Sequence, residues 1–335
     1  MAYIKIDRSA YEYNLDLIAS KAGGYEKVIC VFKDNAYGHG AKLLAPIARA
    51  KGINFIAVKN EAEAKELENI FDNILILSHH PHGNESKKFI YALNARNDIK
   101  KLKKNTKIHL VIDTNMHRNG ILSEEIQEVM QELKSNNLIL CGVMMHFAGS
   151  DEVDASYFVQ KQKFQHAKKL IYNLLQEETK SLVFHSHNSE ALFRANTLED
   201  DEYCRVGLVQ FGYAHFNKDL HKVLSLWAEK LSQRVLKKGQ SVGYGGMYSA
   251  KEDIEIATYD LGYADGLLRY DGKKDFFLPN GKKILGKMSM DSFSCENDSD
   301  VICVLNDANV MANFFNTINY EILVKLSPTL KRIVI

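Results

Sequence analysis

Short, continuously apolar runs alternate with amphipathic stretches over the first two thirds of this 335-residue chain. Apolar strands separated by helices are typical of a parallel sheet that is covered on both faces. The amphipathic stretches, such as AKLLAPIARA and SEEIQEVMQEL, carry the spacing of helices. Seven runs are predicted strands, namely KVICVF, INFIAV, NILIL, IHLVI, LILCGVMM, SLVF and CRVGLV, and FIYALN is an eighth whose pattern also fits a helix.

Eight strand–helix units within about 200 residues indicate a (β/α)8 barrel, a fold of roughly 250 residues. The rival interpretation is a doubly wound open sheet. Its dinucleotide-binding form is disfavoured because no GxGxxG motif follows the first strand. We therefore predict an α/β fold whose N-terminal domain, residues 1–216, is a TIM-type (β/α)8 barrel, with residues 1–8 able to pack with the second domain.

The residue pattern of the sequence changes after Phe216. Glycine-rich turns appear in SVGYGG, LGYADG, YDGKKD and LPNGKK, and short segments with strand character lie between them. We predict a mostly β second domain over residues 217–335. The segments predicted to be strands are DIEIATYDL, FSCEN, DVICVL and YEILVKL.

Composition excludes several classes of protein. The 43 basic and 42 acidic residues leave a net charge of +1, which argues against nucleic acid or anionic membrane as a partner. The five cysteines are scattered, so we expect neither a disulfide framework nor a metal site. The first residues lack the apolar core of a signal peptide, and the longest apolar run, Leu138 to Met145, is too short to span a bilayer. A cytoplasmic location is expected.

A lysine, Lys33, completes the first predicted strand and is followed by DNAYGHG. Barrel enzymes carry their reactive groups at the carboxyl ends of strands. Lys33 could simply extend out of the barrel rim, which is the favoured interpretation for an isolated lysine. It could also be a desolvated lysine suited to Schiff-base chemistry. Tyr37 follows four residues later, and Asn35, Gly38 and Gly40 suit a tight turn.

Other polar residues follow the later strands. Arg118 lies in DTNMHRNG and His146 in MMHFAGSD. Each alone is more often a rim salt bridge or a hydrogen-bonded core histidine. Ser189 can cap the N-terminus of a helix, and such a terminus can bind an anion; CRVGLVQFG brings Arg205 and Gly207 to a strand end. Together with Lys33, these residues predict a pocket for an anionic cofactor with a lysine at its centre.

Several of these segments resemble the alanine racemase family. VFKDNAYGHG is similar to its pyridoxal phosphate signature, and IHLVIDTNMHRNG, GVMMHFAGSD, HSHNSEAL and CRVGL resemble its arginine, histidine, phosphate and pyridine segments. SVGYGGMYSA, LGYADGLLR and GKMSMD match further family motifs in order. The resemblance implies a barrel followed by a β-domain. It also implies a head-to-tail homodimer in which each site is completed by the partner's β-domain.

The resemblance also implies roles for individual residues. Lys33 would hold pyridoxal phosphate as an aldimine, and Tyr244 from the partner chain would be the second base. Arg205 would face the pyridine nitrogen with support from His146, and Arg118 would reach the phenolic oxygen and the substrate carboxylate. Tyr37, Ser189, Gly207 and Leu208 would hold the phosphate, Met290 of the partner would offer its backbone N–H, and Asp151, Tyr263, Arg269 and Asp291 would surround the entrance.

The implied reaction inverts the α-carbon of alanine, so a proton must leave one face and return on the other. Lys33 would take the proton from D-alanine and Tyr244 from L-alanine. The cofactor would delocalise the charge left on the α-carbon. An arginine at the pyridine nitrogen, which cannot give up its proton, would keep that nitrogen unprotonated and limit side reactions. The product would be D-alanine for cell-wall peptidoglycan.

The sequence departs from the family at a few positions. Many members carry a carbamylated lysine where this chain has Val111, so another group must orient Arg118. Asn115 and His117 replace the usual glycines, and Pro328 stands where many members have a tyrosine that contacts the phosphate. Alternatives therefore stay open: a racemase of broader scope that accepts serine, a decarboxylase of the same fold type, a non-catalytic pyridoxal phosphate carrier, or a barrel with neither cofactor nor reaction.

Overall fold

The chain folds into two compact units in a computed structural model that describes residues 1–176, 181–195 and 197–335. The barrel unit comprises Tyr11–Ala36 and Ala41–His221. The β unit comprises Met1–Ala10, Tyr37–Gly40 and Lys222–Ile335. Both ends of the chain and a four-residue piece of the Lys33 loop therefore belong to the β unit.

Eight parallel strands close the barrel, with β2 paired to β9 through Val28 and Cys204. All four residues of β2, β3 and β5 are buried, as expected for strands that are covered on both faces. This confirms the predicted fold class, and it confirms FIYALN as a strand. The strands are β2 (Val28–Val31), β3 (Phe55–Val58), β4 (Asn73–Ile76), β5 (Ile90–Leu93), β6 (Lys107–Val111), β7 (Ile139–Met144), β8 (Val183–His187) and β9 (Glu202–Val206).

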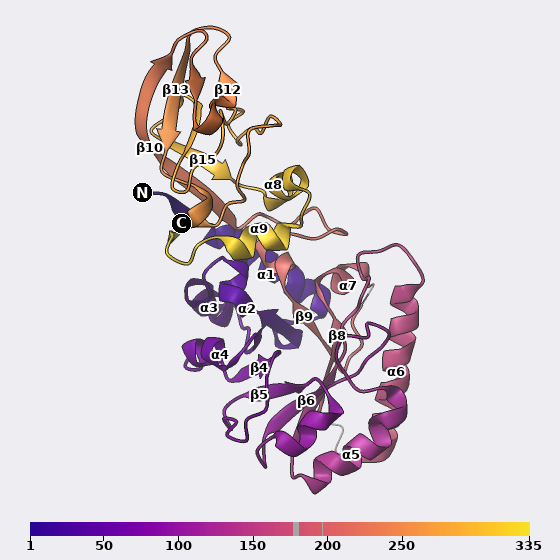
Figure 1. The fold of residues 1–335 in the computed structure, drawn as a ribbon. Coiled ribbons are helices and arrows are strands. Elements are labelled where there is room, and N and C mark those ends of the chain that lie inside the picture. Colours follow the sequence, from indigo (N-terminus) through magenta and orange to yellow (C-terminus); the bar gives the residue numbers. More distant parts are fainter. Residues whose placement is uncertain (177–180, 196) are drawn as a thin grey trace. The chain divides into compact units, whose positions relative to one another are not determined.

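Amphipathic helices surround the barrel strands (Figure 1). One hydrophobic cluster joins Leu110 of β6, Val143 of β7 and Phe184 of β8 to helix residues Val129 and Phe164. Complete burial of such a side chain contributes about 1.5–3 kcal/mol. The helices are α1 (Arg8–Ala22), α3 (Ala41–Ala50), α4 (Glu61–Leu67), α5 (Ile126–Ser135), α6 (Ser156–Leu175) and α7 (Ser189–Arg194).

Two helices at the carboxyl ends of barrel strands begin with a side-chain cap. The Asn60 side chain accepts a hydrogen bond of 3.1 Å from the Glu63 N–H at the start of α4. The Asn188 side chain accepts one of 3.0 Å from the Ala191 N–H at the start of α7. Such caps satisfy backbone donors that a helix leaves unpaired. They fix the start of the two helices that carry residues of the candidate site.

The β unit is built on a sheet with the strand order β14-β13-β10-β1-β16, and β15 also pairs with β10. The N-terminal strand β1 runs antiparallel to β10 and parallel to β16. A short hairpin of β11 (Ser241–Val242) and β12 (Tyr248–Ser249) stands apart from this sheet. The sheet strands are β1 (Tyr3–Ile6), β10 (Leu224–Leu236), β13 (Ile254–Tyr259), β14 (Phe293–Glu296), β15 (Val301–Leu305) and β16 (Lys331–Val334).

The prediction that YEILVKL forms a strand is wrong. This segment is helix α9 (Asn319–Lys325), which packs against helix α8 (Ala308–Phe315). Ile322, Leu323 and Leu326 are buried whereas Val324 is exposed, and that spacing places the apolar residues on one face of a helix. A short apolar run fits both periods, so the sequence pattern did not distinguish them.

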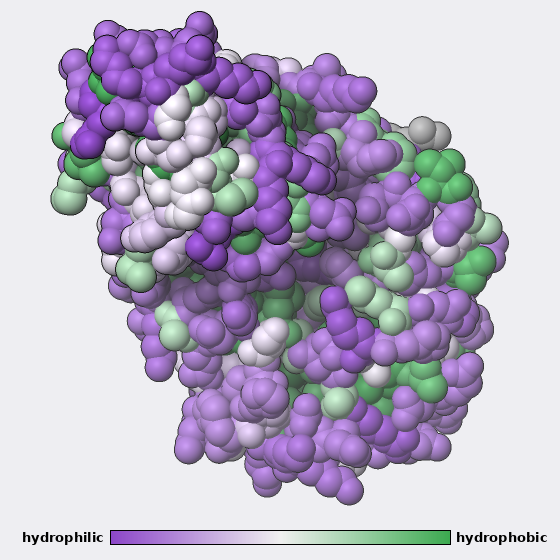
Figure 2. Space-filling view, turned by 45° about the horizontal axis from the view of Figure 1, so that its top comes forward, coloured by the Kyte–Doolittle hydropathy of each residue, from purple (hydrophilic) through white to green (hydrophobic). Residues whose placement is uncertain are grey.

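No helix within the described ranges is long and apolar enough to cross a membrane. Figure 2 shows one face of the molecule, which is largely hydrophilic with hydrophobic residues in small separate groups.

Candidate active site

Lys33 begins a left-handed turn directly after β2. The segment labelled α2 (Lys33–Tyr37) contains Asp34, Asn35 and Ala36 with φ of 52°, 55° and 53°, so it is not a right-handed helix. Each such residue costs roughly 1–2 kcal/mol in an L-amino acid chain. Consecutive strained residues persist where the surrounding structure holds them, and they concentrate at functional sites.

The start of α4 holds this turn in place. Glu63 accepts a 2.7 Å hydrogen bond from the Asp34 N–H and another of 2.7 Å from the Lys59 N–H. The Lys59 ammonium lies 3.0 Å from the Asp34 carboxylate. Asn35 accepts a 2.9 Å hydrogen bond from the Ala41 N–H at the start of α3. Two helix starts therefore fix the backbone that carries Lys33.

Lys33 is half-buried and lies among cations. Burial lowers the pKa of its amine from the ordinary value, and the charges of Arg118, Lys59 and Arg205 lower this pKa further, against the opposite effect of Asp34. A lowered pKa increases the fraction of neutral amine, which is the form that acts as a nucleophile or base. Arg118 and Arg205 therefore both act on the Lys33 amine through their positive charge.

Arg205, in β9, lies among acceptors from β8 and from the residues that follow β7. Its Nη2 donates to the Met145 carbonyl at 2.9 Å and lies 3.0 Å from His146 Nδ1. Its Nη1 lies 2.8 Å from His185 Nδ1. Burial, together with the charges of Arg205, Arg118 and Lys33, lowers the pKa of His146 to about 3. His146 is therefore neutral near pH 7 and can accept a hydrogen bond from the guanidinium.

Two buried histidines that the sequence analysis did not single out extend this network. An arginine can only donate, so His185 Nδ1 accepts and the proton of His185 lies on Nε2. That atom is 2.8 Å from His109 Nδ1, so His109 carries its proton on Nε2. A Cβ on Gly142 would lie 2.7 Å from the His109 ring, so only glycine fits there. The pairing of β8 with β9 shifts its register between His185 and His187, so the HSH spacing alone did not indicate which face His185 occupies.

The predicted phosphate-holding groups of the barrel unit lie together. The Gly207 N–H donates to Ser189 Oγ at 2.9 Å. The prediction that Ser189 caps α7 is wrong, because Asn188 is the cap and Ser189 is the first residue of the helix. Leu208 is the first residue of a short 3-10 segment, Leu208–Phe211. One hydroxyl and successive backbone N–H groups at adjacent strand ends suit an anion. Tyr37 belongs to the β unit, where its buried ring packs edge-on against Tyr320 with centroids 5.9 Å apart.

Arg118 is carried by a loop that Asp113 organises. Asp113 Oδ1 accepts hydrogen bonds of 3.0–3.1 Å from the N–H groups of Asn115, Met116 and His117. Asn115 and His117 have φ of 87° and 53°, a region that favours glycine. The backbone at these two positions therefore adopts a conformation that the glycines expected there would take most readily.

Val111 lies at the end of β6 and is buried. A buried aliphatic side chain offers no charge to orient Arg118, as the sequence indicated.

Asp151, predicted near the entrance, is an exposed residue of the barrel unit.

The remaining predicted residues belong to the β unit and gather around the YADG turn. The Tyr263 and Ala264 N–H groups donate to Ser289 and Met290 carbonyls at 3.3 and 2.9 Å. The Arg269 guanidinium lies 6.0 Å from the Tyr263 ring centroid, and Asp291 is exposed next to Met290. Tyr244 lies in the β11–β12 turn. Tyr244 and Met290 have 65% and 54% of their surface exposed, which leaves both accessible to another chain.

Comparisons with known proteins cover both units. A family model described as "Alanine racemase, N-terminal domain" matches residues 6–215. A second model, "Alanine racemase, C-terminal domain", matches residues 223–334. An alanine racemase from Campylobacter jejuni is 60% identical over 335 residues, which is 100% of each chain.

Solved structures are similar over the same span. The alanine racemase from Bacillus anthracis with bound L-Ala-P is 26% identical, with a TM-score of 0.87 over 100% of this chain and 95% of that one. The alanine racemase from Bartonella henselae with covalently bound pyridoxal phosphate is 25% identical, with a TM-score of 0.85 over 100% of this chain and 99% of that one.

Proposed function

The chain belongs to the alanine racemase family, a family of isomerases, and from this premise we propose that it interconverts L-alanine and D-alanine with pyridoxal phosphate as its cofactor. One observation carries the proposal. Lys33, with a lowered pKa, lies near Arg118 and Arg205, and Arg205 lies in a network of neutral histidines. The bound ligands named for the two similar structures, pyridoxal phosphate and L-Ala-P, agree with it.

The residues of the barrel unit fit pyridoxal phosphate. Lys33 would bind its aldehyde, and the Ser189 hydroxyl with the Gly207 and Leu208 N–H groups would bind its phosphate; the 2.9 Å contact between Ser189 and Gly207 already brings these groups together. Arg205 would donate to the ring nitrogen. When bound, the cofactor would delocalise the negative charge that forms at the α-carbon of the substrate.

Two bases on opposite faces of the α-carbon would invert its configuration. Lys33 would remove the proton from D-alanine and return one to form D-alanine. Tyr244 from a second copy of the chain would do the same for L-alanine. Arg118 would bind the substrate carboxylate, since a guanidinium matches a carboxylate with two parallel hydrogen bonds. The lowered pKa of Lys33 supports its role as a base near neutral pH.

Arg205 would control the fate of the abstracted proton. A guanidinium keeps its proton, so a ring nitrogen that accepts from Arg205 stays unprotonated. That arrangement withdraws fewer electrons from the α-carbon than a protonated ring, and it favours rapid return of the proton over side reactions. His146 and His185 would act as positioning residues for the guanidinium, because both lie within 3.0 Å of its nitrogens.

The exposed β-unit residues support a homodimer. We propose a head-to-tail pair in which Tyr244 and Met290 reach the partner's site, with Asp151, Tyr263, Arg269 and Asp291 around its entrance. The exposure of Tyr244 and Met290 supports this arrangement. The enzyme would be cytoplasmic and would supply D-alanine for peptidoglycan.

The decisive measurement is the rate at which purified protein with added pyridoxal phosphate converts L-alanine to D-alanine. Lys33→Ala should abolish this rate. Lys42→Ala is the matched control, because Lys42 is a surface lysine that pairs with Glu66 at 3.5 Å, and it should leave the rate unchanged. A normal rate in Lys33→Ala would refute the mechanism. A cofactor-bound protein without alanine racemisation would direct the search to serine or to a carrier role.

A further inference from the structure

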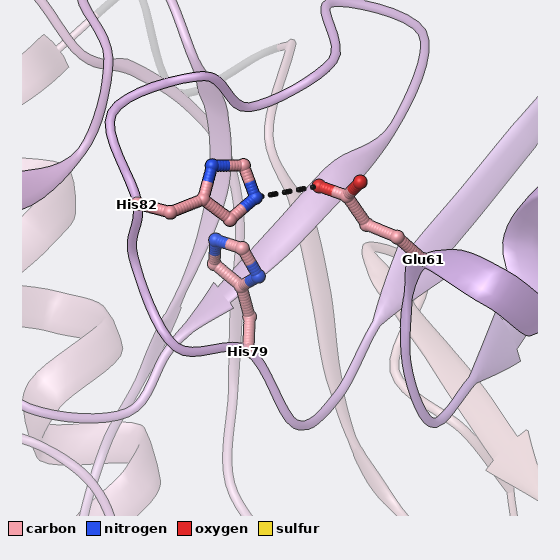
Figure 3. A group of neighbouring side chains, drawn as sticks. All are labelled: Glu61, His79 and His82. Atoms are coloured by element: carbon pink, nitrogen blue, oxygen red, sulfur yellow. Dashed lines mark ion pairs between the residues drawn. The ribbon is translucent and has the colours of Figure 1, made fainter.

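Three metal-binding side chains converge in the barrel unit at a place that the racemisation mechanism does not use. His79 and His82 lie on the loop after β4, and Glu61 is the first residue of α4, which follows β3. Figure 3 shows the two imidazoles and the carboxylate directed toward one another from these two segments. One ligand atom from each residue lies within 4.8 Å of the other two.

We propose that Glu61, His79 and His82 bind a divalent transition-metal ion, with zinc as the best fit. Zinc ligands lie about 2.0–2.1 Å from the ion, so two ligands of a tetrahedral site are about 3.4 Å apart. His82 Nε2 and Glu61 Oε1 are 3.4 Å apart. This separation is longer than the roughly 2.7–3.2 Å of a direct hydrogen bond, and it matches one edge of the tetrahedron.

A buried carboxylate supports His79 in the way that metal sites require. His79 Nε2 lies 3.1 Å from the carboxylate of Glu85, which is only 1% exposed. Glu85 in turn accepts hydrogen bonds of 2.8 Å from the N–H groups of His82 and Lys103. A metal-binding histidine usually donates its second N–H to a carboxylate in this way. His79 would therefore present Nδ1 to the ion.

The carboxylate ligand is oriented as well. The Tyr91 hydroxyl donates to Glu61 Oε1 at 2.8 Å, and the Tyr91 ring also packs against His79 with centroids 4.5 Å apart. Tyr91 thus contacts two of the three ligands. Both residues that support the ligands, Tyr91 and Glu85, are buried, so the site is built into the barrel and is not a chance meeting of surface side chains.

The donor set selects the class of metal. Magnesium and calcium prefer oxygen ligands only, whereas two imidazoles and one carboxylate suit zinc and its neighbours. His82 is 46% exposed at its side chain, so water can reach the ion and supply the fourth ligand. The bound ion would connect the loop after β4 to the start of α4.

The test is titration of untagged, chelator-treated, pyridoxal phosphate-loaded protein with zinc by calorimetry, and with cobalt by visible absorption. The expected result is one ion per chain, a cobalt spectrum of tetrahedral type, and a melting temperature that rises with zinc concentration. His82→Ala and His79→Ala should lose all three signals. His80→Ala is the matched control, because His80 is an exposed histidine of the same loop and should behave as the unchanged protein does.

Equal zinc binding by His82→Ala and His80→Ala would overturn the proposal, as would the absence of binding to the unchanged protein. His82 is partly exposed, so His82→Ala should keep its circular dichroism and its metal-free melting temperature, which separates loss of binding from misfolding. Alanine racemisation is measured on the same metal-free samples. The metal site and the proposed racemase activity can therefore fail independently of each other.

Discussion

At the residue scale, the charge of Arg205 and the neutrality of its histidine neighbours depend on each other. Burial and, to a lesser extent, the charge of Arg205 lower the pKa of His109 to about 3. Burial likewise takes the pKa of His185 well below its ordinary value. The neutral rings of His146 and His185 can then accept hydrogen bonds from the guanidinium, and His109 holds His185 in position. These acceptors allow the guanidinium to stay charged although it is buried.

Arg205→Lys should therefore damage both stability and activity. An ammonium cannot reproduce the fork that reaches Met145, His146 and His185 together. Loss of buried hydrogen bonds of this kind costs about 1–3 kcal/mol, so urea unfolding should show a decrease of that size. The alanine racemisation rate should fall more than the decrease in stability explains. A variant with unchanged kcat would show that the fork is not needed at the ring nitrogen.

The buried histidines also predict how stability depends on pH. The unfolded chain takes up protons on histidine below about pH 6.5, whereas His109 and His146 in the folded chain do not until about pH 3. The free energy of unfolding should thus be highest above about pH 6.5 and should fall as the pH is lowered toward 3. Each such histidine contributes a slope of about 1.4 kcal/mol per pH unit.

His109→Gln isolates this effect. Urea unfolding of the variant and of the unchanged protein is compared at about pH 7 and about pH 5.5, a range in which most carboxylates stay ionised. The variant should be less stable at the higher pH, because the contact with His185 is altered. Its loss of stability between the two pH values should nevertheless be smaller. Parallel pH slopes would contradict the assignment of His109 as a neutral buried ring.

The candidate site could be predicted in part from strand ends. Lys33, Arg118, His146 and Arg205 follow or complete strands, and the carboxyl ends of barrel strands meet on one face. The pKa effects on Lys33 and His146 agree with that grouping. His109 could not be found this way, because it lies within β6 and reaches His185 only when the barrel closes. The sequence pattern does not show which residues of β6 and β8 meet inside the closed barrel.

At the element scale, the loops that carry Lys33 and Arg118 are held in left-handed conformations by specific contacts. Glu63 holds the turn after β2, and Asp113 holds the turn after β6. Gly120 closes the second turn with φ of 117°, and its N–H donates to the Asn94 carbonyl at 2.8 Å. The placement of Arg118 thus depends on backbone geometry more than on a side-chain partner.

Gly120→Ala should displace the Arg118 loop. A Cβ at this position would lie 2.6 Å from the Asp113 backbone nitrogen, so the backbone must shift. Gly281→Ala is the matched control, since Gly281 also has a positive φ, of 81°, but its Cβ would meet nothing within 4 Å. The control should cost about 1–2 kcal/mol from φ alone. Gly120→Ala should cost more and should also raise KM for alanine, and equal effects of the two variants on stability and KM would argue against this reasoning.

Strands and helices could be predicted from the sequence where their burial is the same along their length. Most residues of the eight barrel strands are buried, so their apolar runs identify them, FIYALN included. The β unit is less regular. The long strand β10 changes along its length from alternately buried residues to mostly exposed ones, so it lacks one clear pattern. Helix α9 was predicted as a strand for a different reason: its short apolar run is compatible with the period of a strand and with that of a helix.

At the scale of the whole molecule, the proposed mechanism needs groups from both compact units. Lys33 belongs to the barrel unit and Tyr244 to the β unit. The residue pattern indicates two domains, and only the resemblance to the family implies that the two bases of one site come from different chains. The exposure of Tyr244 favours a second chain as its place of action. The proposed dimer would then be the catalytic unit, and activity would depend on the concentration of protomers.

Mixing two inactive variants tests this arrangement. Lys33→Ala and Tyr244→Phe are each expected to lose racemisation, because each variant lacks one of the two bases. If the two bases come from different chains, a mixed dimer contains one site with both substitutions and one site with neither. Random pairing makes about half of the dimers mixed. Because one of the two sites in each mixed dimer is intact, about a quarter of the unchanged activity should return after the variants are dissociated and reassembled together. If both bases came from the same chain, every site would lack one of them and the mixture would stay inactive.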